Sequence, residues 1–377
     1  MYYFDNNATT PLDERVLADM LPYLSTAHGN ASSAHCYGRK ARVAIDTARE
    51  QVAMLVNAYP AQVIFTSGGT EANNFAIKSS ATQVGHLLVG ATEHASVLNA
   101  AKSLQTRGWR VDTIPVDHNG LLQFQENLLQ NDTRFISVML ANNETGVISP
   151  IQDIVDASQQ REIIFHTDAS QAVGKIPVDF NMIGANLMSL SAHKFYGPQG
   201  VGALITDKSK VLEPLLHGGG QEKGLRSGTE NIAAIVGFGK AAEIAHDEIN
   251  TRVIHYQAIK QQLEAYLSSL EGIEIVAESV ERLPNTTMIV VDDIKGETLL
   301  LGLDHEDIAV SSGSACYAGK TEPSHVLQAM GYSAEQAHNA VRFSLGKEQS
   351  AADVHQLFAA IKKQLHEMRS LALAVAI

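Results

Sequence analysis

Short apolar runs alternate with segments of helical periodicity along the first two thirds of the chain. Most of these runs are apolar throughout, which is typical of strands buried on both faces of a parallel sheet. They predict strands at Val63–Thr66, His86–Gly90, Arg110–Pro115, Arg134–Leu140, Ile163–Thr167, Leu187–Leu190 and Val201–Thr206.

The segments between these strands repeat apolar residues at the spacing of a helix. Ala44, Ala48, Val52 and Leu55 mark one such segment, and apolar residues within 151–155 mark another. Alternation of strands and helices predicts an α/β fold, a mainly parallel sheet with helices on both faces. A ligand of such a sheet binds at the carboxyl ends of the strands.

The order changes after a long helical stretch at about residues 230–270. A strand at Thr286–Val291, a helix at Glu297–Leu303, a strand at Ala340–Ser344 and a final helix follow. A chain of 377 residues suits one large and one smaller domain. We predict a large domain of residues 15–254 and a smaller α+β domain of residues 1–14 and 255–377.

Composition narrows the class of protein. Residues are 45% hydrophobic and 18% charged, as in a soluble globular protein, and the net charge of −13 argues against general binding to nucleic acid or anionic membranes. Two cysteines, Cys36 and Cys316, do not form a disulfide framework, so we expect a reducing cytoplasm. The start, MYYFDNNATTP, is unlike a signal peptide, and no apolar run of about 18 residues predicts a membrane span.

Lys194 lies in SLSAHKFYGPQGVG, where an apolar strand runs into a Gly/Pro-rich turn. A lysine that forms a Schiff base must lose its proton, which a partly desolvated, positively charged site favours. His193 and a nearby phosphate site could supply that charge. The alternative is an ordinary surface lysine.

Two further strand ends carry residues suited to a phosphorylated cofactor. Asp168, in HTDASQAVG, could face a pyridine nitrogen and keep it protonated, or could simply cap a helix. Gly68, Gly69 and Thr70, in TSGGTEANN, precede a helix whose amides could hold a phosphate. No lysine follows these glycines, so the segment is not a Walker motif.

Three other polar residues have both a functional and a structural interpretation. His94, in ATEHASV, could stack on a cofactor ring and move protons, or be a structural histidine. Asn143, in ANNETG, could serve a pocket or only a turn. Arg342, in VRFSLG, could bind a carboxylate with two hydrogen bonds or form a salt bridge.

Cys316 lies in SSGSACYAGKTEP, a Gly/Ser-rich segment that we expect to be a mobile loop with an exposed, reactive thiol. Five of these features follow successive apolar strands. Together they supply a Schiff-base lysine, a ring acid, a phosphate cradle and a proton-moving histidine, a set that predicts bound pyridoxal 5'-phosphate (PLP). No metal site is predicted.

With these motifs the chain resembles the cysteine desulfurases, PLP enzymes of the aspartate-aminotransferase fold. The resemblance runs over nearly the whole length: FDNNATTP, HGNASSAH, TSGGTEANN, TEH, NNETG, HTDASQAVGK, SAHKFYGPQGVG, HGGGQEKGLRSGTEN, SSGSAC and RFSLG. It implies a homodimer with active sites at the subunit interface.

The resemblance also implies a role for each candidate residue. Lys194 carries the cofactor, His94 stacks on its ring, and Asp168 pairs with the pyridine nitrogen. Gln171 and Asn143 approach the phenolic oxygen. The phosphate is held by Gly69, Thr70, Ser191 and His193, together with Thr229 of the other subunit. Arg342 binds the substrate carboxylate, and Cys316 is the nucleophile. Cys36 matches no functional position.

The implied reaction removes sulfur from L-cysteine. Lys194 or His94 takes the α-proton, and Cys316 receives the sulfur as a persulfide while L-alanine leaves. The resemblance also implies a protein that accepts the sulfur from Cys316, either an iron–sulfur scaffold or a protein of nucleic-acid thiolation. The alternatives are a selenocysteine lyase, another PLP lyase or aminotransferase, and a non-catalytic scaffold. An aminotransferase needs no thiol, and a scaffold need not keep Lys194 and Asp168.

Overall fold

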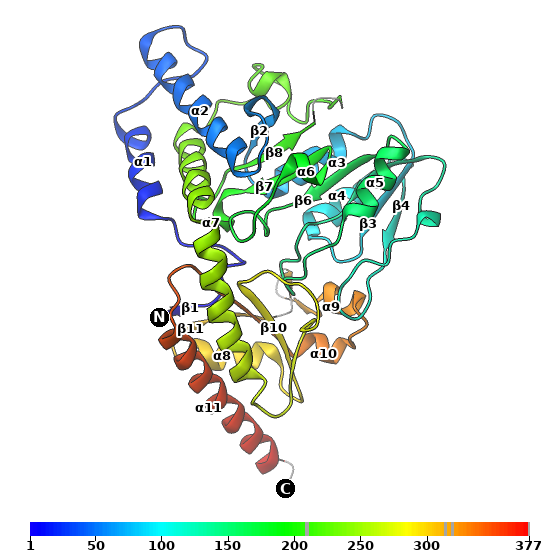
Figure 1. The fold of residues 1–377 in the computed structure, drawn as a ribbon, viewed down its shortest axis with the longest axis vertical. Coiled ribbons are helices and arrows are strands. Elements are labelled where there is room, and N and C mark those ends of the chain that lie inside the picture. The colour runs from blue at the N-terminus through cyan, green and yellow to red at the C-terminus, as the bar shows by residue number, and fades with distance from the viewer. Residues whose placement is uncertain (208–210, 313–314, 318–319, 376–377) are drawn as a thin grey trace.

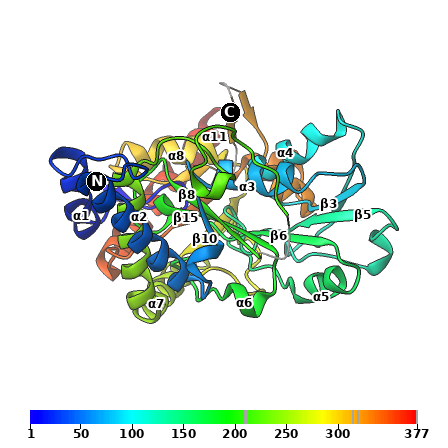
Figure 2. The same cartoon turned by 90° about the horizontal axis from the view of Figure 1, so that it is seen from above.

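The computed structural model describes residues 1–207, 211–312, 315–317 and 320–375. Side chains are described for all of these except 315–317, 320–321 and 371–375. The chain builds a large sheet layered between helices and a smaller sheet with its own helices (Figures 1 and 2).

The large sheet has seven strands within the described residues, in the order β2-β8-β7-β6-β5-β3-β4. All neighbours pair in parallel except β8, which runs antiparallel to β2 and β7. The strands are β2 (Val63–Thr66), β3 (His86–Gly90), β4 (Arg110–Ile114), β5 (Thr133–Ser137), β6 (Ile164–Asp168), β7 (Leu187–Ser191) and β8 (Gly202–Thr206).

All seven predicted strands are present; β2 and β3 have the predicted bounds, and β4, β6, β7 and β8 differ from the prediction by one residue at one or both ends. β5 ends at Ser137, three residues before the predicted end, although Val138 and Leu140 still donate backbone hydrogen bonds to β6. β4 is mostly exposed because it forms an edge of the sheet, so burial on both faces does not hold there.

Helices cover both faces of this sheet, as predicted. On one face α2 (Cys36–Leu55), α5 (Gln152–Gln160) and the first half of α7 (Ile232–Leu267) share a core with the sheet. On the other face α3 (Gly69–Ser79) and α4 (Ala95–Gln105) share a second core. Successive strand residues such as Leu87 and Leu88 enter opposite cores, because side chains of a strand alternate between its faces. α1 (Glu14–Ser25) packs on α7, and α6 (Phe180–Ile183) precedes β7.

The smaller sheet is antiparallel, with the order β12-β15-β10-β9. β1 pairs in parallel with β11, and β13 pairs antiparallel with β14 in a separate two-stranded sheet. These elements are β1 (Tyr2–Tyr3), β9 (Ile273–Ile275), β10 (Thr286–Val291), α8 (Gly296–Asp304), β11 (Ile308–Ala309), β12 (Ser311–Ser312), β13 (Ala315–Tyr317), β14 (Lys320–Glu322), α9 (His325–Ala329), α10 (Ala334–His338), β15 (Ala340–Ser344) and α11 (Ala351–Val375).

One helix joins the two layered units. Residues of the first half of α7, such as Phe238, pack in the core of the large sheet, whereas Tyr256 and Leu263 of its second half pack with the smaller sheet. The predicted boundary at 254/255 therefore falls inside α7, and the division into two domains stays a prediction. Among the described helices, none combines the length and the apolar character needed to cross a membrane.

Candidate active site

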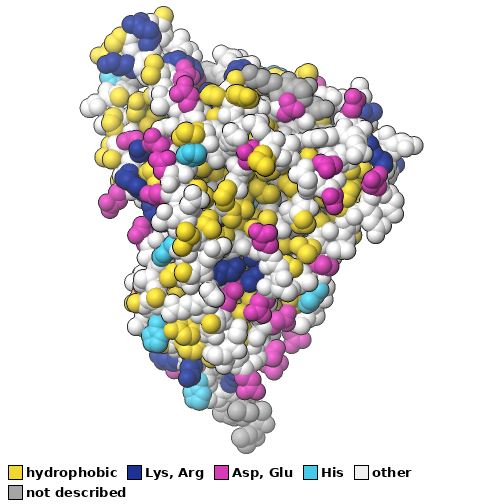
Figure 3. All heavy atoms as spheres, in the orientation of Figure 1, with side chains coloured by type: hydrophobic (Ala, Val, Ile, Leu, Met, Phe, Trp, Pro, Cys, Tyr) yellow, Lys and Arg dark blue, Asp and Glu magenta, His cyan; other side chains and the backbone are white. Residues whose placement is uncertain are grey.

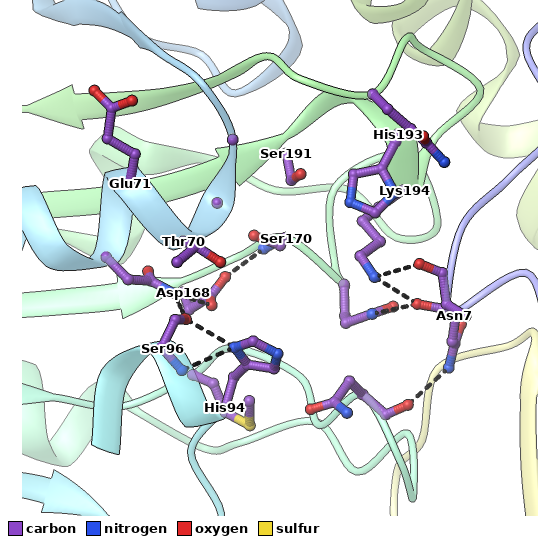
Figure 4. A pocket seen from close by; sticks show the side chains of 18 of the residues that line it. Asn7, Thr70, Glu71, His94, Ser96, Asp168, Ser170, Ser191, His193 and Lys194 are labelled. Carbon is purple, nitrogen blue, oxygen red and sulfur yellow. Dashed lines mark hydrogen bonds between the residues drawn. The ribbon is translucent and has the colours of Figure 1, made fainter. Parts of the chain in front are cut away.

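The carboxyl ends of the parallel strands meet at a cavity of about 610 Å³ (Figure 4). Segments that follow β2, β3, β5, β6 and β7 line it, together with the N-terminal segment and β15, in agreement with the rule for parallel sheets. The lining includes all the predicted pocket residues except Thr229 and Cys316: Gly69, Thr70, His94, Asn143, Asp168, Gln171, Ser191, His193, Lys194 and Arg342.

Lys194 lies in a single 3₁₀ turn directly after β7, and its amine points toward Asn7 (Figure 4). Its Nζ donates hydrogen bonds to the backbone oxygens of Asn7 at 2.7 Å and Ala8 at 2.9 Å. Burial lowers the pKa of Lys194 from 10.5 to about 8, the charge of Arg342 acts in the same direction, and nearby carboxylates oppose it. The unprotonated amine that Schiff-base formation requires is therefore a minor form at pH 7 and far more abundant than for an ordinary lysine.

Asp168 ends β6 and is buried. Its Oδ1 accepts the backbone N–H of Ser170 at 2.9 Å within a turn. No helix begins directly after Asp168 in the described chain, since the next one is α6 at Phe180–Ile183, so the helix-capping interpretation is wrong. Its Oδ2 accepts the Nδ2 amide of Asn73 at 2.7 Å. Asp168 lines the cavity, as the functional interpretation predicts.

His94 is the N-cap of α4, where its Nδ1 accepts the backbone N–H of Ser96 at 3.1 Å. The ring also points into the cavity (Figure 4). Burial lowers the pKa of His94, and so does the positive charge of Lys194, while Asp168 raises it. The structural and functional interpretations coexist in this residue.

The predicted phosphate cradle is compact and mostly uncharged. A Cβ built on Gly69 lies 3.1 Å from Ser170 Oγ and 3.4 Å from Ser191 Cβ, so the glycine leaves the start of α3 open. The hydroxyl of Ser170 is buried and has no protein partner. Burial lowers the pKa of His193 to about 4, helped by Lys194, so its ring is neutral at pH 7. Free amides and hydroxyls of this kind suit a phosphate.

Gln171 and Asn143 sit beside the lysine, held by neighbours that sequence reasoning missed. Gln171 donates from Nε2 to the backbone oxygen of Asn7 at 3.0 Å, and its Oε1 accepts from Lys175 Nζ at 2.5 Å. Burial lowers the pKa of Lys175 well below 10.5, and the charge of Lys194 adds to this. The backbone oxygen of Asn143 accepts from Asn7 Nδ2 at 3.2 Å.

Arg342 enters the cavity from β15 and already has partners. Its Nη2 donates to Asp5 Oδ1 at 2.6 Å, and its Nη1 donates to the backbone oxygen of Asn143 at 2.8 Å. Its Nε is buried without a partner. The salt-bridge interpretation of Arg342 is thus seen directly, and any substrate carboxylate has to share the guanidinium with Asp5.

Cys316 and Thr229 are not among the described residues that line the cavity. The backbone of Cys316 pairs with Thr321 in the β13–β14 hairpin, while its side chain lies outside the described residues, as do 313–314 and 318–319 of the expected mobile loop. Thr229 is exposed, and its predicted contact with the other subunit stays a prediction. Within the described part of the chain, no three His, Cys, Asp or Glu side chains gather where they could bind a metal ion.

The fold and the cavity together define the class of α/β enzymes with the aspartate-aminotransferase-like fold of PLP-dependent transferases. The chain belongs to the class-V aminotransferase family, whose model matches residues 2–357.

Curated proteins and solved structures are similar to this chain over almost its full length. The chain is 41% identical over 377 residues to "Cysteine desulfurase IscS 1" of Archaeoglobus fulgidus, covering 98% of each chain. It is 40% identical to "Probable cysteine desulfurase, mitochondrial" of Schizosaccharomyces pombe, covering 98% of this chain and 75% of that protein. A solved "NifS-like protein" superposes with a TM-score of 0.91 at 36% identity, covering 97% and 99% of the two chains. The structure "SspA in complex with cysteine" does so with a TM-score of 0.81 at 35% identity, covering 92% and 99%.

Proposed function

We propose that this enzyme is a cysteine desulfurase, which converts L-cysteine to L-alanine and keeps the sulfur as a persulfide on Cys316. The observation that carries the proposal is the single cavity into which Lys194, Asp168, His94 and Arg342 converge from four separate parts of the chain. The names of the similar proteins, cysteine desulfurases at about 40% identity, support the same reaction.

The proposed cofactor is PLP, and the residues present fit it. The open Gly69 cradle and the unpartnered Ser170 hydroxyl suit the phosphate, with Thr70, Ser191 and His193 beside them. Asp168, which lines the same cavity, would pair with the ring nitrogen. When bound, this cofactor supplies an electron sink for the α-carbon of an amino acid.

The chain's own residues then divide the remaining work. Lys194, with its lowered pKa, is suited to hold the cofactor and, once released, to accept the α-proton at Nζ. Arg342 binds the substrate carboxylate after sharing or exchanging Asp5. Gln171 and Asn143 border the lysine and orient its surroundings.

We assign sulfur transfer to Cys316. Its thiolate attacks the substrate sulfur, an S–S bond forms, the C–S bond breaks, and the bonding electron pair leaves with carbon. Protonation of that carbon gives alanine. A homodimer, with Thr229 serving the cavity of the other subunit, and a sulfur-acceptor protein of iron–sulfur assembly or nucleic-acid thiolation complete the proposal.

The test measures alanine and sulfide from L-cysteine with a reductant, for the wild type and Cys316→Ala, with an absorbance spectrum of each. We expect both proteins to be yellow, and only the wild type to release equimolar products. Equal activity of Cys316→Ala would remove the thiol from the mechanism and leave another PLP lyase or transferase. A colourless protein that takes up no added PLP would overturn the cofactor proposal. Selenocysteine offered in place of cysteine tests the lyase alternative, which predicts turnover without Cys316.

A further inference from the structure

A chain of hydrogen bonds joins Asp168 to His94 beneath the cavity (Figure 4). Asn73 of α3 donates from the same Nδ2 amide to Asp168 Oδ2 at 2.7 Å and to Ser96 Oγ at 2.8 Å. Ser96 Oγ in turn lies 2.7 Å from His94 Nδ1. Asn73 and Ser96 are both buried, so water does not compete for these contacts.

The direction of each hydrogen bond follows from what its atoms can do. Asp168 accepts at both carboxylate oxygens, so the amide of Asn73 must turn its nitrogen, and not its oxygen, toward that residue. The second hydrogen of this NH₂ group goes to Ser96 Oγ, which thereby acts as an acceptor. The hydroxyl hydrogen of Ser96 is then free to point at His94 Nδ1.

A backbone amide decides the protonation of the ring. The N–H of Ser96 also points at His94 Nδ1, at 3.1 Å, and a backbone N–H is always a donor. Nδ1 faces two donors and must offer its lone pair, so the neutral ring carries its proton on Nε2.

We propose that Asn73 and Ser96 are positioning residues that hold His94 as the Nε2–H tautomer, and thereby make it a hydrogen-bond donor toward the cavity. Their contacts stand without any cofactor, whereas their catalytic meaning rests on the proposed desulfurase function.

The tautomer separates the two candidates for the α-proton base. A neutral His94 with its proton on Nε2 has no lone pair there with which to take a proton. Protonation of His94 to the imidazolium would also place a hydrogen on Nδ1, where it would face the hydroxyl and the backbone N–H of Ser96, which are both donors. The titratable groups near the ring are Asp168 after β6, Lys194 after β7 and His325 of α9. Burial lowers the pKa of His94, Asp168 raises it, and Lys194 and His325 lower it. Proton abstraction therefore falls to Lys194, while His94 donates a hydrogen bond to an electron-rich atom of the bound substrate.

Nitrogen NMR of the ring gives a test that does not depend on turnover. The full chain is labelled with ¹⁵N-histidine, with and without bound PLP, and the His94 signals are assigned by their absence in His94→Gln. We expect the Nε2–H tautomer in the wild type. In Ser96→Ala one donor to Nδ1 is lost, and the pKa of His94 should rise toward the ordinary 6.5. Ser96→Thr keeps the hydroxyl and should restore the wild-type titration.

A double-mutant cycle tests whether Asn73 acts through Ser96. Asn73→Ala should raise the pKa of His94 on its own but have no further effect in the Ser96→Ala background. Asn74→Ala is the matched control, because this neighbour on α3 donates to the Thr70 backbone oxygen and is not among the described residues that line the cavity. In the loaded enzyme, Ser96→Ala should lower kcat about tenfold and leave KM for cysteine nearly unchanged.

Two results would overturn the proposal: an Nδ1–H tautomer in the wild type, or an identical His94 titration in Ser96→Ala. A circular-dichroism melt of each variant checks its folding, and Ser96→Ala alone decides the matter if Asn73→Ala does not fold. Failure of the proposed function is distinct, because a chain that makes no alanine could still show the predicted tautomer.

Discussion

Arg342 and Asp5 form an ion pair at 2.6 Å within the candidate active site, between β15 and the N-terminal segment. The side chain of Arg342 is largely buried, so its charge is poorly screened, and Asp5 offsets part of it. The residue proposed to bind the substrate carboxylate thus already has a carboxylate partner.

Asp5→Asn should strengthen substrate binding. The amide oxygen of asparagine can still accept from Arg342, so the geometry is kept while the competing charge is removed. We expect KM for L-cysteine to fall about three- to tenfold, with kcat changed less, because charge-assisted hydrogen bonds are the stronger ones. Alanine formation against cysteine concentration measures this. Asp304→Asn, on the exposed end of α8, controls for net charge, and a higher KM in Asp5→Asn would show that Asp5 orients Arg342 instead.

Cofactor capture should depend on pH through Lys194. The unprotonated amine is the reactive form, and the pKa of Lys194 is lowered to about 8 by burial first and by Arg342 second. The rate at which the cofactor-free enzyme binds PLP covalently should therefore rise with pH and level off above this value. Borohydride trapping followed by peptide mass analysis identifies the modified lysine. Arg342→Gln should move the midpoint to higher pH, and an unchanged midpoint would contradict this electrostatic cause.

The backbone framework could be predicted from the sequence because buried strands are short apolar runs. β2 and β3 begin and end as predicted. β5 ends early and β4 is exposed for reasons of position in the sheet, which no local pattern encodes. The boundary predicted at 254/255 falls inside α7, because the first half of this helix packs in the core of the large sheet and its second half packs with the smaller sheet.

The hydrogen-bond partners of the candidate catalytic residues were harder to predict than the candidate residues themselves. Lys194, Asp168 and His94 each follow an apolar strand, and that position marked them. Asn7 approaches Lys194 from a segment 187 residues away in sequence, and only the folded chain brings them together. Asn73 sits one turn into α3 in a motif already singled out for its glycines, but no sequence signal shows that its amide reaches Asp168.

Gly69→Ala should impair the phosphate cradle while leaving the fold intact. The added Cβ would lie 3.1 Å from Ser170 Oγ and 3.4 Å from Ser191 Cβ, in the space proposed for the phosphate. Alanine favours a helix more than glycine does, so α3 loses nothing. We expect the Kd for PLP to rise at least about tenfold, because the methyl group would keep the phosphate from its hydrogen-bond partners, and one such bond is worth about 1.4 kcal/mol. Absorbance titration measures the Kd, and a thermal melt of the cofactor-free protein should be unchanged. Equal PLP affinity would place the phosphate elsewhere.

Lys175→Met should destabilise the enzyme in a way that depends on pH. Lys175 is buried and donates to Asn7 Oδ1 at 2.7 Å and to Gln171 Oε1 at 2.5 Å. Its removal leaves Gln171 Oε1 unpaired, while Asn7 Oδ1 keeps the hydrogen bond from Asn285 Nδ2 at 3.2 Å. The lost pairing should cost about 1–3 kcal/mol in the free energy of unfolding.

The sign of the pH effect follows from the lowered pKa of Lys175. Between that lowered value and 10.5 the unfolded chain binds more protons than the folded one, so folding is favoured as pH rises. The contribution is complete above 10.5 and is lost as pH falls through the lowered pKa. The deficit of Lys175→Met in urea unfolding should therefore be larger at about pH 9 than at about pH 6. Lys102→Met, at an exposed position of α4, is the matched control and should show no such trend. A deficit that shrinks with rising pH would mean that Lys175 is charged in the folded enzyme.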